Sequence, residues 1–140
     1  MCGFVGFTNY IDNSNLVIGN MMDRIKHRGP DSEGKYVDED IAMGFRRLSI
    51  IDLAQGSQPL YNEDNSKVLT FNGEIYNFQE IRETLIKAGH KFTTHTDSEV
   101  LLHGYEEFGT GLLNKLRGMF AFVIWDKNKK ELFGARDFSV

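Results

Sequence analysis

The sequence predicts an α+β domain in which helices are layered on antiparallel sheets. Strand-like segments follow one another closely along the chain, and helical periodicity is confined to three segments set among them. The composition is that of a globular protein, with 140 residues of which 41% are hydrophobic and 26% are charged. A chain of this length can bury a sizeable core, so we expect one domain over residues 1–140.

The first half of the chain predicts a strand, a helix and two further strands. Residues 3–7 (GFVGF) have the alternating apolar pattern of a buried strand. Residues 13–29 predict a helix that ends at a Gly-Pro pair. The residues expected on its buried face are Leu16, Ile18, Met21, Met22 and Ile25. Residues 34–37 and 41–50 then predict two strands separated by the acidic turn DED.

The second half predicts one strand, two helices and a hairpin. Residues 67–73 have the pattern of a strand that ends in an Asn-Gly turn. Helices are expected over residues 77–90 and 96–109, capped by Asn77 and by Asp97 or Ser98. Their expected apolar faces contain Ile81, Leu85, Val100, Leu101, Tyr105 and Phe108. The segments GMFAFVIWD and ELFGARD predict a hairpin joined by the charged turn KNKK.

Charge and hydropathy exclude several classes of function. The chain has 16 basic and 20 acidic residues, a net charge of −4, which disfavours a general nucleic-acid binder. No apolar run approaches the roughly 20 residues of a membrane span, and the first residues lack the pattern of a signal peptide. A single cysteine cannot form an intramolecular disulfide. We therefore expect a cytoplasmic protein that binds neither nucleic acid nor membrane.

The four histidines do not indicate a metal site. His27, His90, His95 and His103 share no i, i+4 spacing, and no second cysteine is present to assist them. We expect them to be solvated or structural.

Cys2 is the only cysteine, and it follows the initiator methionine directly. If Met1 is removed, Cys2 carries both a thiol and a free α-amine, whose reference pKa is about 7.7–8.0. The neutral amine can accept the thiol proton, directly or through a water, and so activate the nucleophile without a histidine. Taken alone, this stretch is equally consistent with a buried cysteine near a chain end.

Four further stretches carry polar groups suited to a ligand site. KHRGPD sets Arg28 and Asp31 about a Gly-Pro turn, and HTDSE places an aspartate at a helix start. FRRLSIID sends Arg46 and Arg47 to opposite faces of a strand end, where one of them can reach a ligand carboxylate. FNGEIYN offers an amide side chain beside an unhindered backbone N–H, as an oxyanion hole requires. Each stretch also has a structural explanation: a solvated loop, a helix cap, two solvated arginines and a hairpin turn.

Seven segments occur in a fixed order between Cys2 and about Asp137: MCGFVGF, HRGPD, RLSIID, QPLYN, NGEIYN, TDSE and GMFAFVIWD. In this order they resemble the domains of class II glutamine amidotransferases. Within that family, HRGPD, RLSIID, QPLYN and NGEIYN are similar to the glutaminase domain of glutamine-hydrolysing asparagine synthetases. The resemblance implies an N-terminal-nucleophile hydrolase fold, a four-layer α/β/β/α sandwich of two antiparallel sheets.

The resemblance also implies a reaction. Cys2 would attack the side-chain amide of glutamine, and hydrolysis through a thioester would give glutamate and ammonia. Asn72 and the backbone N–H of Gly73 would form the oxyanion hole.

The same resemblance implies how the substrate is held. Arg47 would bind the α-carboxylate of glutamine, and Glu74 and Asp97 would bind its α-ammonium group. The backbone of Leu48 and Ile50 would line the same pocket, and HRGPD would lie over it.

Partners and cofactors follow from the resemblance as well. L-glutamine is the expected substrate, and its ammonia would pass to a C-terminal synthetase domain that uses ATP and Mg; the glutaminase domain needs no cofactor. The chain has no SGGLDS-like pyrophosphate loop, so no synthetase domain is expected in it. Relatives continue after ARD with PLYY, so we expect the domain to be incomplete at its C-terminal end. A homodimer is compatible with the resemblance for the full-length protein.

Two alternatives remain open. Besides the asparagine-synthetase-type glutaminase, the chain could be the glutaminase of another class II amidotransferase with a different acceptor, or a catalytically silent regulatory module. RLSIID and NGEIYN disfavour the hexosamine-phosphate and purine-pathway groups. The silent module is disfavoured because all six of these site residues are intact: Cys2, Arg47, Asn72, Gly73, Glu74 and Asp97.

Overall fold

The computed structural model describes residues 2–8, 11–48 and 57–138. It divides into two compact units, Met1–Pro59 and Leu60–Val140. Each unit has its own antiparallel sheet. No helix within the described residues is long and apolar enough to cross a membrane.

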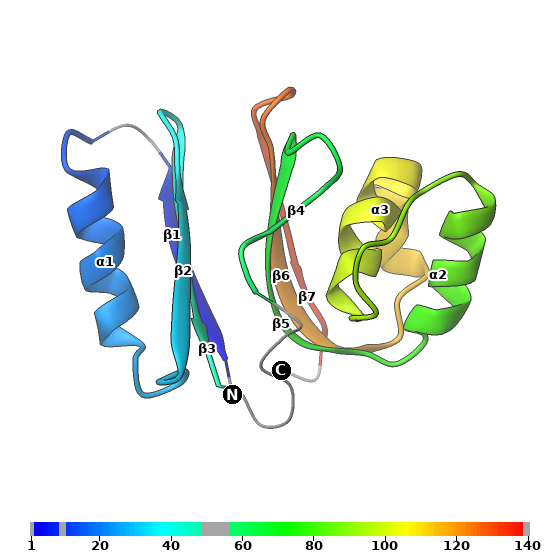
Figure 1. Ribbon diagram of the computed structural model, residues 1–140, viewed down its shortest axis with the longest axis horizontal. Helices are drawn as coiled ribbons and strands as arrows, with labels where there is room; N and C mark the ends of the chain where they lie inside the picture. Colours follow the sequence, from blue (N-terminus) through cyan, green and yellow to red (C-terminus); the bar gives the residue numbers. More distant parts are fainter. Residues whose placement is uncertain (1, 9–10, 49–56, 139–140) are drawn as a thin grey trace. The chain divides into compact units, whose positions relative to one another are not determined.

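The first unit is a three-stranded sheet with one helix on one of its faces (Figure 1). The sheet order is β1-β3-β2, so the last strand in sequence lies at the centre. Ile18 and Met22 of the helix are buried. The elements are β1 (Gly3–Thr8), α1 (Ser14–Arg24), β2 (Ser32–Val37) and β3 (Ile41–Arg47).

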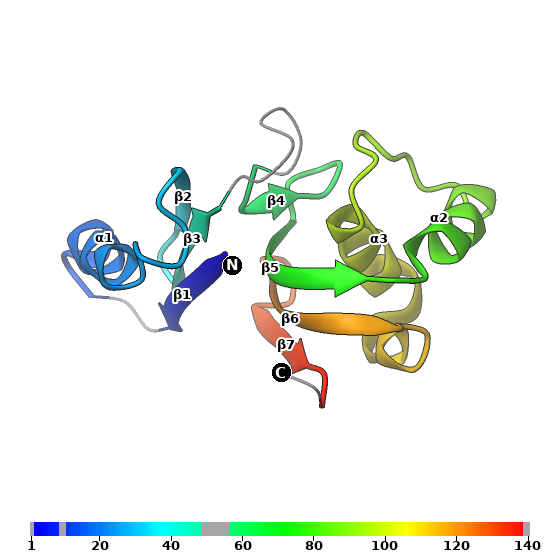
Figure 2. The ribbon, with the colours of Figure 1, turned by 90° about the horizontal axis from the view of Figure 1, so that it is seen from below.

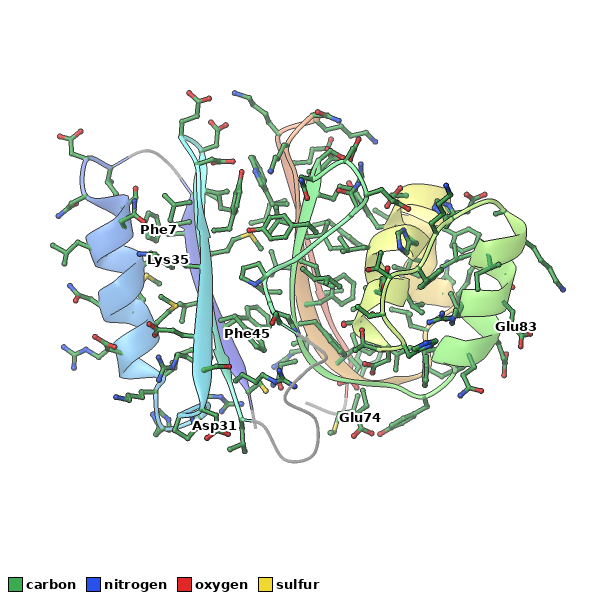
Figure 3. All side chains as sticks on the ribbon, viewed as in Figure 1. Phe7, Asp31, Lys35, Phe45, Glu74 and Glu83 are labelled. Atoms are coloured by element: carbon green, nitrogen blue, oxygen red, sulfur yellow. The ribbon has the colours of Figure 1, made fainter. Side chains whose placement is uncertain are left out.

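Side chains alternate across this sheet as the period of a strand requires. Phe7 and Lys35 point toward α1, and Phe45 points to the opposite face (Figure 3). Since Arg46 and Arg47 follow Phe45 on β3, Arg46 is on the α1 side and Arg47 is on the side of Phe45. The prediction that the two arginines face opposite ways is confirmed.

The second unit is a four-stranded sheet in the order β4-β5-β6-β7, with its helices on one face (Figures 1 and 2). The long strands β5 and β6 pair over their whole length, and β6 and β7 form the predicted hairpin. The elements are β4 (Leu60–Tyr61), β5 (Lys67–Ile75), α2 (Phe78–Lys87), α3 (Ser98–Phe108), η1 (Gly109–Asn114), β6 (Gly118–Asp126) and β7 (Glu131–Arg136). The strand β4 and the 3₁₀ helix η1 are not predicted by the sequence.

Apolar side chains of α2 and α3 form the core of this unit with those of β5 and β6. All four residues predicted to face inward on α3 contact this core, as do both of those on α2. The fully buried members include Leu69, Leu85, Val100, Leu101, Leu102, Leu112 and Ile124. The predicted apolar faces of both helices are therefore confirmed.

The predicted end of the first helix is wrong, and the two predicted N-caps are confirmed in position only. The first helix ends at Arg24 rather than near Gly29, and Leu16 on its expected inner face is 61% exposed. Asn77 and Asp97 occupy N-cap positions, but neither side chain makes a capping hydrogen bond. The carboxamide of Asn77 instead donates to the carbonyl of Lys115 and accepts from the N–H of Arg117. These side chains join separate segments, which a local capping rule does not describe.

The predicted turn at Asn72-Gly73 is also wrong, since β5 continues through these residues to Ile75. Asn72 pairs with Ala121 and Gly73 with Phe120 on β6. Gly73 has a φ of 134°, and a Cβ there would lie 2.1 Å from the carbonyl oxygen of Met119. Glycine is required by this close pairing of two strands and not by a hairpin turn.

Candidate functional site

In the first unit, the predicted nucleophile lies directly before β1 and against the end of β3. The backbone N–H of Leu48 donates to Cys2 Sγ at 3.4 Å, and the thiol lies 3.9 Å from the carbonyl oxygen of Leu48. Cys2 is half-buried. The structure thus brings together two residues of the predicted site. Ile50, also predicted to line the pocket, lies outside the described residues.

The HRGPD turn holds this chain end in place. Arg28 Nε donates to the carbonyl oxygen of Cys2 at 3.2 Å, and the N–H of Asp31 donates to the carbonyl oxygen of Arg47 at 3.0 Å. Gly29 is buried, and a Cβ on it would lie 2.4 Å from the backbone of Arg46. The Gly-Pro turn therefore packs against the end of β3 and connects it to Cys2, which a solvated loop would not do.

The two arginines at the end of β3 have different surroundings. Arg46 is 5% exposed, donates from Nε to the carbonyl oxygen of Gly29 at 3.0 Å, and pairs with the carboxylate of Glu33. The alternative that both arginines are solvated is therefore wrong for Arg46, whose guanidinium is used within the fold. Arg47, the arginine predicted to bind substrate, is half-buried on the opposite face of the strand.

In the second unit, the predicted oxyanion-hole residues lie on β5. Asn72 and Gly73 are half-buried, and Glu74 that follows them is exposed. Figure 3 shows Glu74 near the end of this strand, away from the exposed Glu83 on α2. An amide side chain, a glycine N–H and a carboxylate thus follow one another along a strand whose position is fixed by pairing with β6.

Asp97 connects the start of α3 to the end of the same strand. Its carboxylate accepts a hydrogen bond from the backbone N–H of Ile75 at 2.8 Å. Burial raises the pKa of Asp97, and the nearby charge of Glu74 raises it further, although backbone hydrogen bonds oppose this. Glu74 is therefore close enough to Asp97 for its charge to act on that carboxyl group.

A buried polar cluster on α3 was not predicted by the sequence. His103 is 1% exposed, and its Nε2 lies 3.2 Å from the carboxylate of Glu99, which is 3% exposed. Burial opposes the ionisation of both groups. Hydrogen bonds to Glu106 and Glu99 nevertheless raise the pKa of His103 to about 9, and hydrogen bonds from His103 and Thr94 lower that of Glu99 to about 2.

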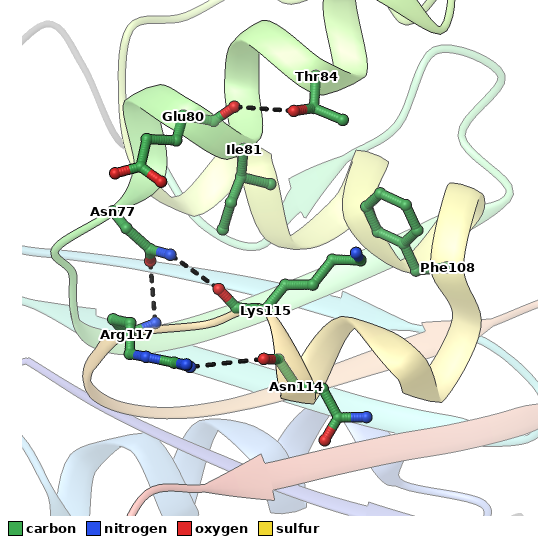
Figure 4. Close-up of a pocket in the computed structure, with 8 residues that line it drawn as sticks. All are labelled: Asn77, Glu80, Ile81, Thr84, Phe108, Asn114, Lys115 and Arg117. Atoms are coloured by element: carbon green, nitrogen blue, oxygen red, sulfur yellow. Dashed lines mark hydrogen bonds between the residues drawn. The ribbon is translucent and has the colours of Figure 1, made fainter.

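The second unit also has an open cavity of about 400 Å³ that contains none of the predicted site residues (Figure 4). It lies between the start of α2 and the segment that joins η1 to β6. The ammonium group of Lys115 lies 4.5 Å from the ring centre of Phe108 there. The lining residues are Asn77, Glu80, Ile81, Thr84, Phe108, Asn114, Lys115 and Arg117. Hydrogen bonds join Asn77 to the backbone of Lys115 and Arg117, and the Arg117 guanidinium to the carbonyl oxygen of Asn114. We assign no catalytic role to this cavity.

Residues 1–139 match the glutamine amidotransferase domain family. This chain belongs to that family. The predicted resemblance to class II glutamine amidotransferases is thereby confirmed.

Two curated relatives show which members of the family the chain is similar to. It is 50% identical over 142 residues to asparagine synthetase [glutamine-hydrolyzing] 1 of Bacillus subtilis, with 98% of the chain and 22% of the relative covered. It is 44% identical over 140 residues to asparagine synthetase [glutamine-hydrolyzing] 2 of Arabidopsis thaliana, with 98% and 24% covered. The chain thus spans about a quarter or less of the length of these relatives.

A solved structure has the same fold. The glutamine phosphoribosylpyrophosphate amidotransferase of B. subtilis, in complex with ADP and GMP, matches with a TM-score of 0.77 at 20% identity. The match covers 98% of this chain and 37% of that one. The predicted α+β class with two antiparallel sheets, of the N-terminal-nucleophile hydrolase type, is confirmed.

Proposed function

We propose that this glutamine amidotransferase domain hydrolyses L-glutamine with Cys2 as its nucleophile. The thiolate attacks the side-chain amide carbon, the C–N bond breaks, and ammonia leaves with a proton returned by the α-amine of Cys2. Water then hydrolyses the resulting thioester to glutamate and regenerates the thiol. The observation that carries the proposal is that residues 1–139 match the family and the chain's one thiol is Cys2, held before β1 by Leu48 and Arg28.

The α-amine of Cys2 serves as the general base, so Met1 must be removed before the enzyme is active. An N-terminal amine is partly neutral at physiological pH and can take the thiol proton directly or through a water. The N–H that Leu48 donates to Cys2 Sγ at 3.4 Å holds the sulfur in place beside the α-amine of the same residue.

The remaining predicted residues act on the same glutamine. Asn72 and the N–H of Gly73 stabilise the oxyanion, and Arg47 binds the α-carboxylate. Glu74 and Asp97 bind the α-ammonium group, and their proximity to each other supports this role. The backbone of Leu48 and Ile50 lines the pocket.

The ammonia serves an ATP-dependent amidation elsewhere in a longer protein. The named relatives support aspartate as the acceptor, and the chain covers about a quarter or less of their length. We therefore propose that a C-terminal synthetase domain with ATP and Mg completes the reaction, in the cytoplasm and as a homodimer when full length. The glutaminase chemistry itself uses no cofactor.

Glutamate release by the purified chain tests the proposal. We expect hydrolysis of glutamine by protein whose intact mass shows that Met1 is gone, and none above background in Cys2→Ala. Glu83→Gln, an exposed residue on α2, is the matched control and should keep full activity. Unchanged activity in Cys2→Ala would refute the nucleophile. A folded chain without Met1 that releases no glutamate would support the silent-module alternative instead.

A further inference from the structure

Four side chains with metal-ligand chemistry converge in the second unit, apart from the residues assigned to glutamine. Glu63 lies in the turn between β4 and β5, His90 follows α2, and His103 and Glu106 are on α3. One ligand atom from each lies within 4.8 Å of those of the other three. The cluster therefore joins three segments that are distant in sequence.

The two ring nitrogens of His103 have different partners: Nδ1 faces the cluster, and Nε2 faces Glu99, which is outside it. The Nε2 atom lies 3.2 Å from Glu99, whose carboxylate accepts the backbone N–H groups of Thr93 and Thr94 at 2.8 Å each. A carboxylate fixed in this way accepts a hydrogen bond from Nε2–H, so Nδ1 is the nitrogen that gives up its proton when an ion binds and then presents its lone pair to that ion. That Nδ1 lies 3.2 Å from Glu63 and 3.3 Å from Glu106.

His90 repeats this arrangement. Its Nε2 lies 2.8 Å from the carboxylate of Glu107, outside the cluster, and its Nδ1 lies 3.9 Å from Glu106. The rings of His90 and His103 have centroids 5.4 Å apart. Histidines that bind metals commonly donate their second N–H to a carboxylate, which orients the ring and increases the basicity of the ligand nitrogen. Both histidines meet this condition.

We propose that Glu63, His90, His103 and Glu106 bind a divalent transition-metal ion of the zinc class. With bonds of about 2.0–2.1 Å, tetrahedral ligand atoms lie roughly 3.3 Å apart, close to the spacing between His103 Nδ1 and both carboxylates. Two imidazoles favour zinc-like ions over Mg²⁺ and Ca²⁺, which prefer oxygen ligands throughout. Two carboxylates balance the charge of the ion.

Four protein ligands leave no open coordination position, so this is a structural site. The ion cross-links the β4–β5 turn, the segment after α2, and α3. It competes with protons for the two Nδ1 atoms, so binding releases any proton held there. The sequence does not reveal the site, because its ligands come from three segments that only the fold brings together.

Cobalt titration of the chelator-treated chain tests this proposal. We expect one Co²⁺ per chain with the visible absorption of a tetrahedral nitrogen and oxygen site, displaced by an equivalent of Zn²⁺. His90→Gln and Glu63→Gln should each weaken binding by more than roughly 100-fold. His95→Gln is the matched control, because His95 is exposed and outside the cluster. Cys2→Ser should bind as the unaltered chain does, which excludes chelation by the terminal thiol and amine.

Thermal unfolding provides a second measurement, since a metal that binds only the folded chain raises its melting temperature. Zn²⁺ should raise Tm in the unaltered chain and in His95→Gln, and it should not in His90→Gln. Absence of stoichiometric binding would overturn the proposal. Binding that survives both His90→Gln and Glu63→Gln, or that is lost in Cys2→Ser, would overturn it as well.

Discussion

Asp97 and Glu99 lie two residues apart at the start of α3, yet folding shifts their pKa values in opposite directions. Glu99 is 3% exposed and accepts hydrogen bonds from Thr93, Thr94 and His103. Burial opposes its ionisation, but these donors outweigh it and lower the pKa of Glu99 to about 2. The folded chain therefore strongly favours the ionised Glu99.

At Asp97 the hydrogen-bond donors do not outweigh the effect of burial. Asp97 accepts the N–H of Ile75 at 2.8 Å, but burial and the charge of Glu74 together raise its pKa above the ordinary value. A carboxylate surrounded by donors stabilises the fold. A carboxylate whose ionised form the fold disfavours is stabilised by an added cation, such as the ammonium group of glutamine.

The largest expected effect is on stability at Glu99. Glu99→Ala leaves the buried His103 and the backbone N–H groups of Thr93 and Thr94 without their acceptor, which should cost about 3–5 kcal/mol of unfolding free energy. Urea unfolding with a chelator present measures this. Glu83→Ala, on the exposed side of α2, should change the free energy by no more than about 0.5 kcal/mol. Equal effects of the two substitutions would contradict the structural role of Glu99.

Asp97→Asn should impair substrate binding and leave the stability of the fold intact, the opposite of Glu99→Ala. Loss of one charged hydrogen bond to the ammonium group, about 1.5–3 kcal/mol, should raise KM for glutamine roughly 10- to 100-fold. Stability should stay the same or increase, because the disfavoured buried charge is gone. Steady-state kinetics and urea unfolding of one preparation measure both quantities. An unchanged KM would remove Asp97 from the substrate site.

The two arginines at the end of β3 extend the comparison to positive charge. Arg46→Gln should destabilise the fold by about 1–3 kcal/mol, because its contacts to Gly29 and Glu33 are lost. Arg47→Gln should raise KM for glutamine, because the proposed partner of the α-carboxylate is lost. A KM effect confined to Arg46→Gln would reverse the assignment.

The smallest expected effect is a difference in pH dependence. The pKa of Glu99 falls from its ordinary 4.5 to about 2 on folding, so its stabilisation is present above pH 4.5 and disappears as the pH falls toward 2. The pKa of Asp97 rises above its ordinary 3.8, so its contribution is present below 3.8 and is lost as the pH rises through the folded value.

Urea unfolding across acidic pH, with chelator, separates these two contributions. The stability deficit of Glu99→Gln should shrink as the pH falls below 4.5. The stability of Asp97→Asn relative to the unaltered chain should instead increase as the pH rises. Parallel pH profiles for the two variants would contradict the contrast between the carboxylates.

Local patterns predict much of this fold. Alternation identifies β1, β3 and the β6–β7 hairpin, and helical spacing identifies the buried faces of α2 and α3, because both signals depend on nearby residues. The order of short motifs identifies the family. The candidate residues of the site follow from that resemblance and not from periodicity.

Features that depend on distant contacts are not predicted. Asn72-Gly73 has the composition of a turn, but pairing with β6 keeps it in a strand. Arg46 and Arg47 are adjacent in sequence, and the contacts of Arg46 with Gly29 and Glu33 come from segments that only the fold brings to it. His90 and His103 come together because the segment after α2 lies against α3. The spacing of the two histidines in the sequence does not predict this contact.

The intact mass of the chain, before and after exposure to a glutamine analogue with an electrophilic carbon at the amide position, tests the central claim most directly. We predict that Met1 is absent and that one adduct forms per chain. Free glutamine should block the adduct, and Cys2→Ala should lack it. A chain without Met1 whose Cys2 is never labelled, or is labelled equally with and without glutamine, would contradict the assignment of Cys2 as a glutamine-directed nucleophile.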